Sequence, residues 1–133
     1  MNKKFWIIIC LTVALLGFSI FEMIYASTTT DSLRKELLAL QTEISTLIEN
    51  EETDLSNATE DTISLIEYWD ERESILCLMF NHNDMKDLTK EIIQIRSYLE
   101  QEDLEEAYVH CTLAVRQVDS LTHLIDTTIQ NIL

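Results

Sequence analysis

An uncharged, mostly apolar run from Phe5 to Phe21 constrains this chain more than any other feature. Counted on to Tyr25, the segment would be about 31 Å long as an α-helix, which is enough to cross a hydrocarbon core of about 30 Å. Trp6 and Tyr25 lie near its two ends, where amphipathic rings favour the membrane boundary. The run therefore predicts a transmembrane helix over residues 5–25.

The charges that flank this segment predict its orientation. Lys3 and Lys4 precede it, and basic residues are enriched on the cytoplasmic side of membrane helices. We therefore expect residues 1–4 to form a cytoplasmic tail and residues 26–133 to lie outside the cell, on a single-pass protein of the cell membrane.

A cleaved signal peptide is the alternative, because Ala26 is a small residue at which a signal peptidase could cut. Ile24 fits the required small-x-small pattern poorly, and the apolar run is longer than the roughly 7–15 residues of a signal-peptide core. The uncleaved anchor is the favoured interpretation. Cys10 is not preceded by a lipoprotein signal, and we expect it to face lipid as a small apolar residue.

The rest of the chain, residues 26–133, is strongly acidic, with 23 Asp and Glu against 7 Lys and Arg. It contains no proline, and the one glycine of the chain, Gly17, lies in the apolar run. Helices joined by polar residues are the expected result. The negative charge disfavours binding to nucleic acid and to an anionic lipid surface. We therefore expect an acidic extracytoplasmic domain that stands off the membrane.

Apolar residues recur at steps of three and four along four stretches, as on the buried face of an amphipathic helix. The four stripes are Leu33, Leu37, Leu40, Ile44 and Leu47; Leu55, Ala58, Leu65, Ile66, Trp69, Leu76, Met79 and Phe80; Met85, Leu88, Ile92, Ile95 and Leu99; and Leu104, Ala107, Cys111, Ala114, Val118, Leu121, Ile125 and Ile132. The first helix could begin at Asp31 or Ser32, or it could run on from the membrane segment. Asp103 and Glu106 have the spacing of a capping box.

Each stripe covers one face only, so each helix must bury that face against another element. Short joints favour antiparallel neighbours, and the sequence predicts an all-α protein with an antiparallel bundle of three or four helices after the transmembrane helix. A long intermolecular coiled coil is the competing architecture. It would need one seam through the joints, whereas the stripes restart at each of them.

Several short motifs together resemble one known family. They are the lysine-flanked anchor, Trp69, the run Asn81-His82-Asn83-Asp84, Tyr98-Leu99 before an acidic joint, and Asn131-Ile132-Leu133. The pattern is similar to a family of short, uncharacterised membrane-anchored helical proteins of Firmicutes, chiefly clostridia, which is catalogued as a domain of unknown function. The resemblance implies an all-helical extracytoplasmic domain and brings no activity, cofactor or catalytic residue. Many relatives carry a glycine where this chain has Asp54-Leu55-Ser56-Asn57, which leaves the start of the second helix open.

Cys77 and Cys111 fall on different helical stretches and could form a disulfide between the second and last helices outside the cell. The alternative is two buried apolar thiols, which is favoured if the host is an anaerobe, as the resemblance suggests. His82, His110 and His123 could supply metal ligands together with these cysteines. No pair has the short spacing that makes a metal site specific, so we expect neither a metal nor a cofactor.

Trp69 lies on a core stripe, and we expect it to be a packing anchor rather than a platform for a ligand. His82 and Asp84 stand at a helix joint, where capping is the expected role. The acidic runs, such as Glu102 to Glu106, lack the glycine-containing loop of a calcium site. Solvated helix faces and caps explain these runs adequately.

The sequence predicts a protein that is not an enzyme, because it contains no glycine-rich phosphate loop, nucleophile elbow or zinc-protease motif. The expected function is a protein-interaction or structural module of the cell envelope, with an envelope protein or a second copy of the chain as its partner. The alternative is a ligand- or cation-responsive domain that acts through a membrane partner. The short tail at residues 1–4 disfavours this alternative, because it offers little with which to signal.

Overall fold

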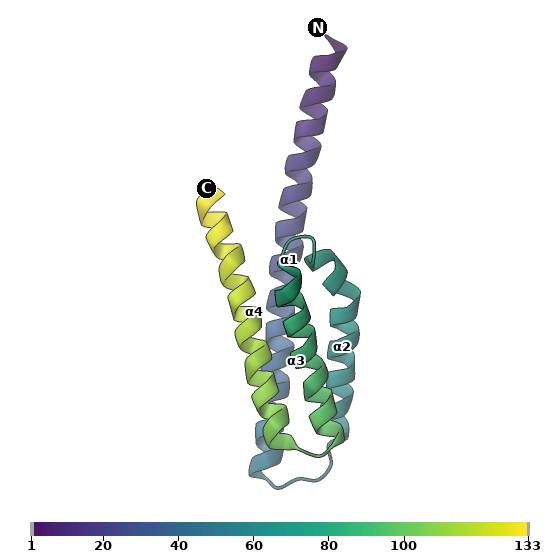
Figure 1. The fold of residues 1–133 in the computed structure, drawn as a ribbon, viewed down its shortest axis with the longest axis vertical. Coiled ribbons are helices and arrows are strands. Elements are labelled where there is room, and N and C mark those ends of the chain that lie inside the picture. Colours follow the sequence, from purple (N-terminus) through teal and green to yellow (C-terminus); the bar gives the residue numbers. More distant parts are fainter. Residues whose placement is uncertain (1, 133) are drawn as a thin grey trace.

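The computed structural model describes residues 2–132, and this part of the chain contains four α-helices (Figure 1). They are α1 (Lys3–Glu49), α2 (Ser56–Leu76), α3 (His82–Glu100) and α4 (Leu104–Ile132). No β-strand occurs among the described residues. The predicted all-α fold, with a long apolar first helix that leads into a bundle, is confirmed.

α1 is one uninterrupted helix of 47 residues, so the apolar segment and the first helix of the bundle are a single element. Asp31 and Ser32 lie inside this helix and do not begin a new one. The polar residues after the apolar segment can remain helical. Thr30 Oγ1, for example, donates a hydrogen bond to the carbonyl oxygen of Ala26 at 2.9 Å, within the helix itself.

α1 has an exposed part and a packed part. Residues 3–21 are exposed along their whole length, packing against the core begins at Met23, and Ala26 is completely buried. Among the described helices, α1 alone is long and apolar enough to cross a membrane, by length and composition. The contact between α1 and the bundle thus begins before residue 26, inside the segment that the sequence assigns to the membrane.

The helices form an antiparallel square in which each one contacts two others. α1 packs against α2 and α4, and α3 packs against the same two helices, with no backbone contact between the diagonal pairs in the described region. Figure 1 shows that α4 extends past the α2–α3 connection beside α1. We call the end that carries residues 49–55 and 100–106 the tip, and the end that carries residues 77–81 the upper end.

One apolar core runs along the axis of this square. It contains the largest buried side chain, Trp69, at 1% exposure, and leucine, isoleucine and valine side chains from all four helices. Thr62 is also fully buried, and its Oγ1 donates to the carbonyl oxygen of Ala58 at 2.7 Å. Because this hydroxyl makes a hydrogen bond within its own helix, its burial does not carry the cost of an unpaired polar group.

The end of the second helix differs from the predicted stripe. α2 ends at Leu76, and Met79 and Phe80 lie in the connection to α3, although both still pack against the core. α2 stops early because α3 begins soon afterwards. The Asn81 side chain caps α3 by accepting a hydrogen bond from the backbone N–H of Asn83 at 2.9 Å. The chain must leave the helix before this cap.

The caps of the other helices follow local chemistry. Asp103 Oδ1 accepts from the backbone N–H of Glu106 at 3.2 Å, which is the first half of the predicted capping box. Before α2, Asp54 Oδ1 accepts from both the N–H and the hydroxyl of Ser56. At α3 the side-chain cap is Asn81, while Asp84 lies in the first helical turn.

Candidate functional site

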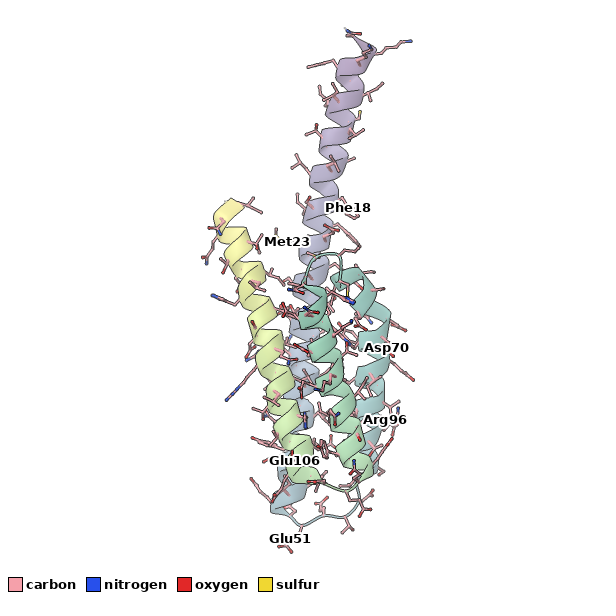
Figure 2. All side chains as sticks on the ribbon, in the orientation of Figure 1. Phe18, Met23, Glu51, Asp70, Arg96 and Glu106 are labelled. Atoms are coloured by element: carbon pink, nitrogen blue, oxygen red, sulfur yellow. The ribbon has the colours of Figure 1, made fainter. Side chains whose placement is uncertain are left out.

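The tip gathers exposed acidic residues from two connections that are distant in sequence. Nine carboxylate side chains lie there, on Glu49, Glu51, Glu52, Asp54, Glu100, Glu102, Asp103, Glu105 and Glu106. Figure 2 labels Glu51 and Glu106 at this end of the molecule. Neither segment contains lysine or arginine, so no basic residue of the two segments offsets the charge.

The two turns at the tip are built in the same way. Glu51 and Glu102 have φ angles of 52° and 59°, in the left-handed region that favours glycine. After each of them the next N–H bonds back into the preceding helix, from Glu52 at 3.1 Å and from Asp103 at 2.9 Å. These bonds define the Schellman motif. A non-glycine residue in this conformation costs about 1–2 kcal/mol, so glutamate stands at two positions where glycine would be more stable.

A groove of about 570 Å³ lies between the two turns. The apolar part of its lining comes from Leu47, Ile48 and Leu104, and the remaining lining residues are polar or acidic: Glu51, Glu52, Gln101, Glu102, Asp103 and Glu105. The groove is shallow and open to solvent, and a surface of one charge sign raises the local concentration of the opposite charge. The groove therefore fits basic side chains better than acidic or neutral ones.

Sequence reasoning assigned these carboxylates to helix faces and caps and did not place them together. A signal for the tip is nevertheless present, since no lysine or arginine occurs between Lys35 and Arg72 or between Arg96 and Arg116. In an antiparallel bundle of four helices, the first and third connections lie at the same end. The two stretches without lysine or arginine span these connections. The negative charges of the first and third connections therefore add at one end of the bundle.

A second acidic contact joins α1 to α2. The pKa of Glu43 is raised above its ordinary value of 4.5 by burial, and further by a hydrogen bond with Asp61 and by the negative charge of Asp61. Two carboxylates in one site cannot both ionise without repulsion. The contact between the first two helices is therefore sensitive to pH.

His110 on α4 is packed against α3. Its Nδ1 lies 2.5 Å from Oε2 of Glu91, and its ring stacks on Tyr98 with 5.1 Å between ring centroids. His82 at the start of α3 and His123 on α4 are exposed, so the structure does not gather the three histidines. Among residues 2–132, no group of three or more His, Cys, Asp or Glu side chains is arranged to hold a metal ion.

Cys77 and Cys111 are both free thiols in the structure. Cys77 follows the last residue of α2 at the upper end, whereas Cys111 lies in the second turn of α4 near the tip. A disulfide needs Cα atoms within about 7 Å, and α2 and α4 are a diagonal pair, so the fold does not bring the two sulfurs together. Burial raises the pKa of Cys111 to about 12, as suits an apolar core thiol.

The fold and the tip define a class of protein, an acidic four-helix bundle that continues from a long apolar N-terminal helix. A family model described as a domain of unknown function (DUF4363) matches residues 21–132, which include the whole described bundle. This chain belongs to the DUF4363 family. The predicted membership of an uncharacterised family is thereby confirmed. Neither the curated proteins nor the solved structures contain a match to the chain.

Proposed function

We propose that this chain is a single-pass membrane protein that holds an acidic helical bundle outside the cell and binds a basic partner protein of the envelope through the tip. The observation that carries the proposal is the continuity of α1. One helix joins the exposed apolar segment to the bundle, and the acidic tip lies at the far end of the same helix.

The length of α1 supports a display role for the tip. From Phe21 to Glu49 the helix rises about 42 Å at about 1.5 Å per residue. This distance is several times the Debye length of about 8 Å at physiological ionic strength. The tip is therefore held well beyond the range at which anionic lipids would repel it, and it faces the envelope.

The charges around the apolar segment support the proposed orientation. Lys3 and Lys4 stand at one end of the exposed part of α1, and Glu22 stands at the other. Basic residues favour the cytoplasmic side of a membrane helix. The bundle then lies outside the cell, with residues 1–4 inside.

The polar groups inside the bundle support a binding role rather than catalysis. Trp69 Nε1 on α2 donates to Thr89 Oγ1 on α3, and this hydroxyl donates to Glu73 Oε1 on α2. His110 on α4 bonds to Glu91 on α3. These contacts hold neighbouring helices together. The tip, by contrast, offers charge that attracts a partner over a distance and accelerates association in a salt-dependent way.

A charge-neutralised tip tests this proposal in native membranes. The tip variant replaces three exposed carboxylates of the groove, Glu52→Gln, Glu102→Gln and Glu105→Gln. The matched control removes the same number of charges from exposed positions on α1 and α2, as Glu36→Gln, Glu67→Gln and Asp70→Asn. A photo-crosslinking residue at Gln101, which lines the groove, reports the partner in each background.

We expect one adduct with a protein that carries a basic surface. It should be lost in the tip variant and at high salt and retained in the control. Equal yields in the two variants, or an adduct that ignores salt, would contradict binding through the tip. An adduct at twice the 15.5 kDa mass of the chain would show self-association instead of a basic partner.

A further inference from the structure

The upper end of the bundle has a surface unlike the tip. Leu78, in the α2–α3 connection, is the most exposed large apolar side chain of the described region, at 74%. Ile132 and Leu124 on α4 are 68% and 49% exposed. The last turns of α4 extend beyond the α2–α3 connection (Figure 1), and Leu124 lines the same cleft as Met79 and Phe80 of that connection. Beyond residue 24, the two most exposed large apolar side chains, Leu78 and Ile132, thus lie near the end where the bundle meets the apolar segment.

A cleft of about 320 Å³ opens at this end between α1, α4 and the α2–α3 connection. Its lining residues are Ser19 and Met23 of α1; Met79, Phe80, Asn81 and Asp84 of the connection and α3; and Leu124, Ile125 and Thr128 of α4. Its volume lies in the range of about 300–1,000 Å³ that is typical of small-molecule sites. Met23 is labelled in Figure 2.

The polar side chains of this cleft are largely satisfied by their own helices. Ser19 Oγ donates to a carbonyl oxygen of α1 at 3.1 Å, and Thr128 Oγ1 donates to a carbonyl oxygen of α4 at 2.8 Å. Asn81 Oδ1 accepts from the backbone of α3. What the cleft presents is therefore mainly methyl, thioether and aromatic surface, with the charge of Asp84 on one side.

The α1 residues that line the cleft show where it lies relative to the membrane boundary. Ser19 belongs to the exposed apolar part of α1, Met23 is where packing against the core begins, and Glu22 lies between them. A carboxylate avoids the hydrocarbon core, so the membrane boundary lies close to Glu22. The cleft therefore straddles this boundary, and one of its walls continues the segment that crosses the membrane.

We infer that the upper end is a second membrane contact, in which Leu78 and the last turns of α4 enter the outer membrane boundary and the cleft takes an acyl chain of a neutral phospholipid. The inference rests on the proposed anchoring by α1. Neutral rather than anionic lipid fits because Glu22, Asp84 and Asp126 place negative charge around this end. The bundle then sits on the membrane with its apolar end down, whereas its net charge alone predicts that it stands off.

Tryptophan quenching in the full-length protein tests the contact. The protein is reconstituted in phosphatidylcholine vesicles with brominated acyl chains, which quench tryptophan emission in the membrane. The reporter variant is Trp6→Phe with Leu78→Trp. The matched control is Trp6→Phe with Ile93→Trp, because Ile93 is a 52% exposed apolar residue on α3 well below the upper end. Trp69 is buried in the bundle and gives the same background in both.

We expect quenching of the new tryptophan at 78 to exceed that at 93 by at least threefold. Equal quenching at the two positions would overturn the membrane contact. The unsubstituted protein shows whether α1 is inserted at all, because Trp6 should be quenched if α1 crosses the membrane. Quenching of Trp6 without stronger quenching at position 78 would therefore overturn the second contact alone. Loss of quenching at both Trp6 and position 78 would overturn the anchoring, and the second contact with it.

A photoactivatable phosphatidylcholine with a diazirine near the end of its acyl chain tests the cleft itself. Labelling is expected in peptides that contain Met79 and Phe80 and in those that contain Leu124, but not in the peptide around Ile93. Labelling confined to residues 3–21 of α1 would show that lipid contacts the anchor alone and would overturn the occupancy of the cleft.

Discussion

The indole Nε1 of Trp69 donates a hydrogen bond to Oγ1 of Thr89 at 2.7 Å, and this bond joins α2 to α3 inside the bundle. The same hydroxyl lies 3.0 Å from Oε1 of Glu73, one turn after Trp69 on α2. Trp69, the largest buried side chain of the described region, is thus packed in the core and has a hydrogen-bond partner for its indole N–H, as buried tryptophan usually does.

Trp69→Ala should destabilise the bundle by about 3–5 kcal/mol, because it removes a large core side chain and leaves a cavity. Thermal unfolding of the full-length chain in detergent, followed by circular dichroism, measures the effect. Trp6→Ala is the matched control, since Trp6 is exposed in the apolar part of α1. If Trp69→Ala melted like the parent but lost its crosslinked partner, Trp69 would be a docking residue instead.

The pH dependence of stability should report the Glu43–Asp61 contact. The raised pKa of Glu43 means that the folded chain keeps this proton where the unfolded chain has already lost it. Its stabilising contribution is therefore complete below the ordinary value of 4.5 and is lost as the pH rises through the raised folded pKa. We expect the melting temperature to fall as the pH rises above 4.5.

Glu43→Gln should flatten this profile and raise the melting temperature at neutral pH, because glutamine resembles the protonated acid. Glu36→Gln removes one charge from an exposed position on the same helix and controls for the general relief of repulsion in an acidic domain. Profiles of the same slope for the two variants would show that the Glu43–Asp61 contact carries none of the pH dependence.

Glu102→Gly should stabilise the bundle by about 1 kcal/mol, because glycine adopts the left-handed conformation without the clash of a side chain. Gln101→Gly at the preceding residue, where φ is −89°, is the control and should be neutral or destabilising. A drop in melting temperature for Glu102→Gly would show that the glutamate side chain itself contributes to the fold. A gain in stability together with weaker partner binding would link the glutamate to the function of the tip.

The helices and their buried faces could be predicted from the sequence because the spacing of apolar residues reports burial directly. Leu33, Leu37 and Ile44 are predicted and found in the core. The end of α2 could not be predicted in this way. Met79 and Phe80 keep apolar spacing and core contact through a turn, so the stripe does not reveal where the helix stops.

The tip and the cleft depend on which helix ends meet in space, and a linear pattern does not contain this information. Glu51 and Glu102 become neighbours only because the first and third connections share one end of the square. The cleft needs α4 to extend beyond α2 and α3 along α1. The pairing of Cys77 with Cys111, which the sequence left open as one of two alternatives, depends on the same information, because the two residues lie near opposite ends of the bundle.

The most direct test of an anchored bundle that presents its tip outside the cell is the labelling of a cysteine placed at the tip. Glu52→Cys can be made in the native background, because Cys10 lies in the apolar segment, Cys77 is partly buried and Cys111 is buried with a raised pKa. Intact cells are treated with a membrane-impermeant maleimide, and membranes are then washed at alkaline pH. We expect strong labelling of the Glu52→Cys protein in the washed membranes and weak labelling of the unsubstituted chain. Labelling only after lysis, or a shortened labelled form in the medium, would contradict the anchored topology.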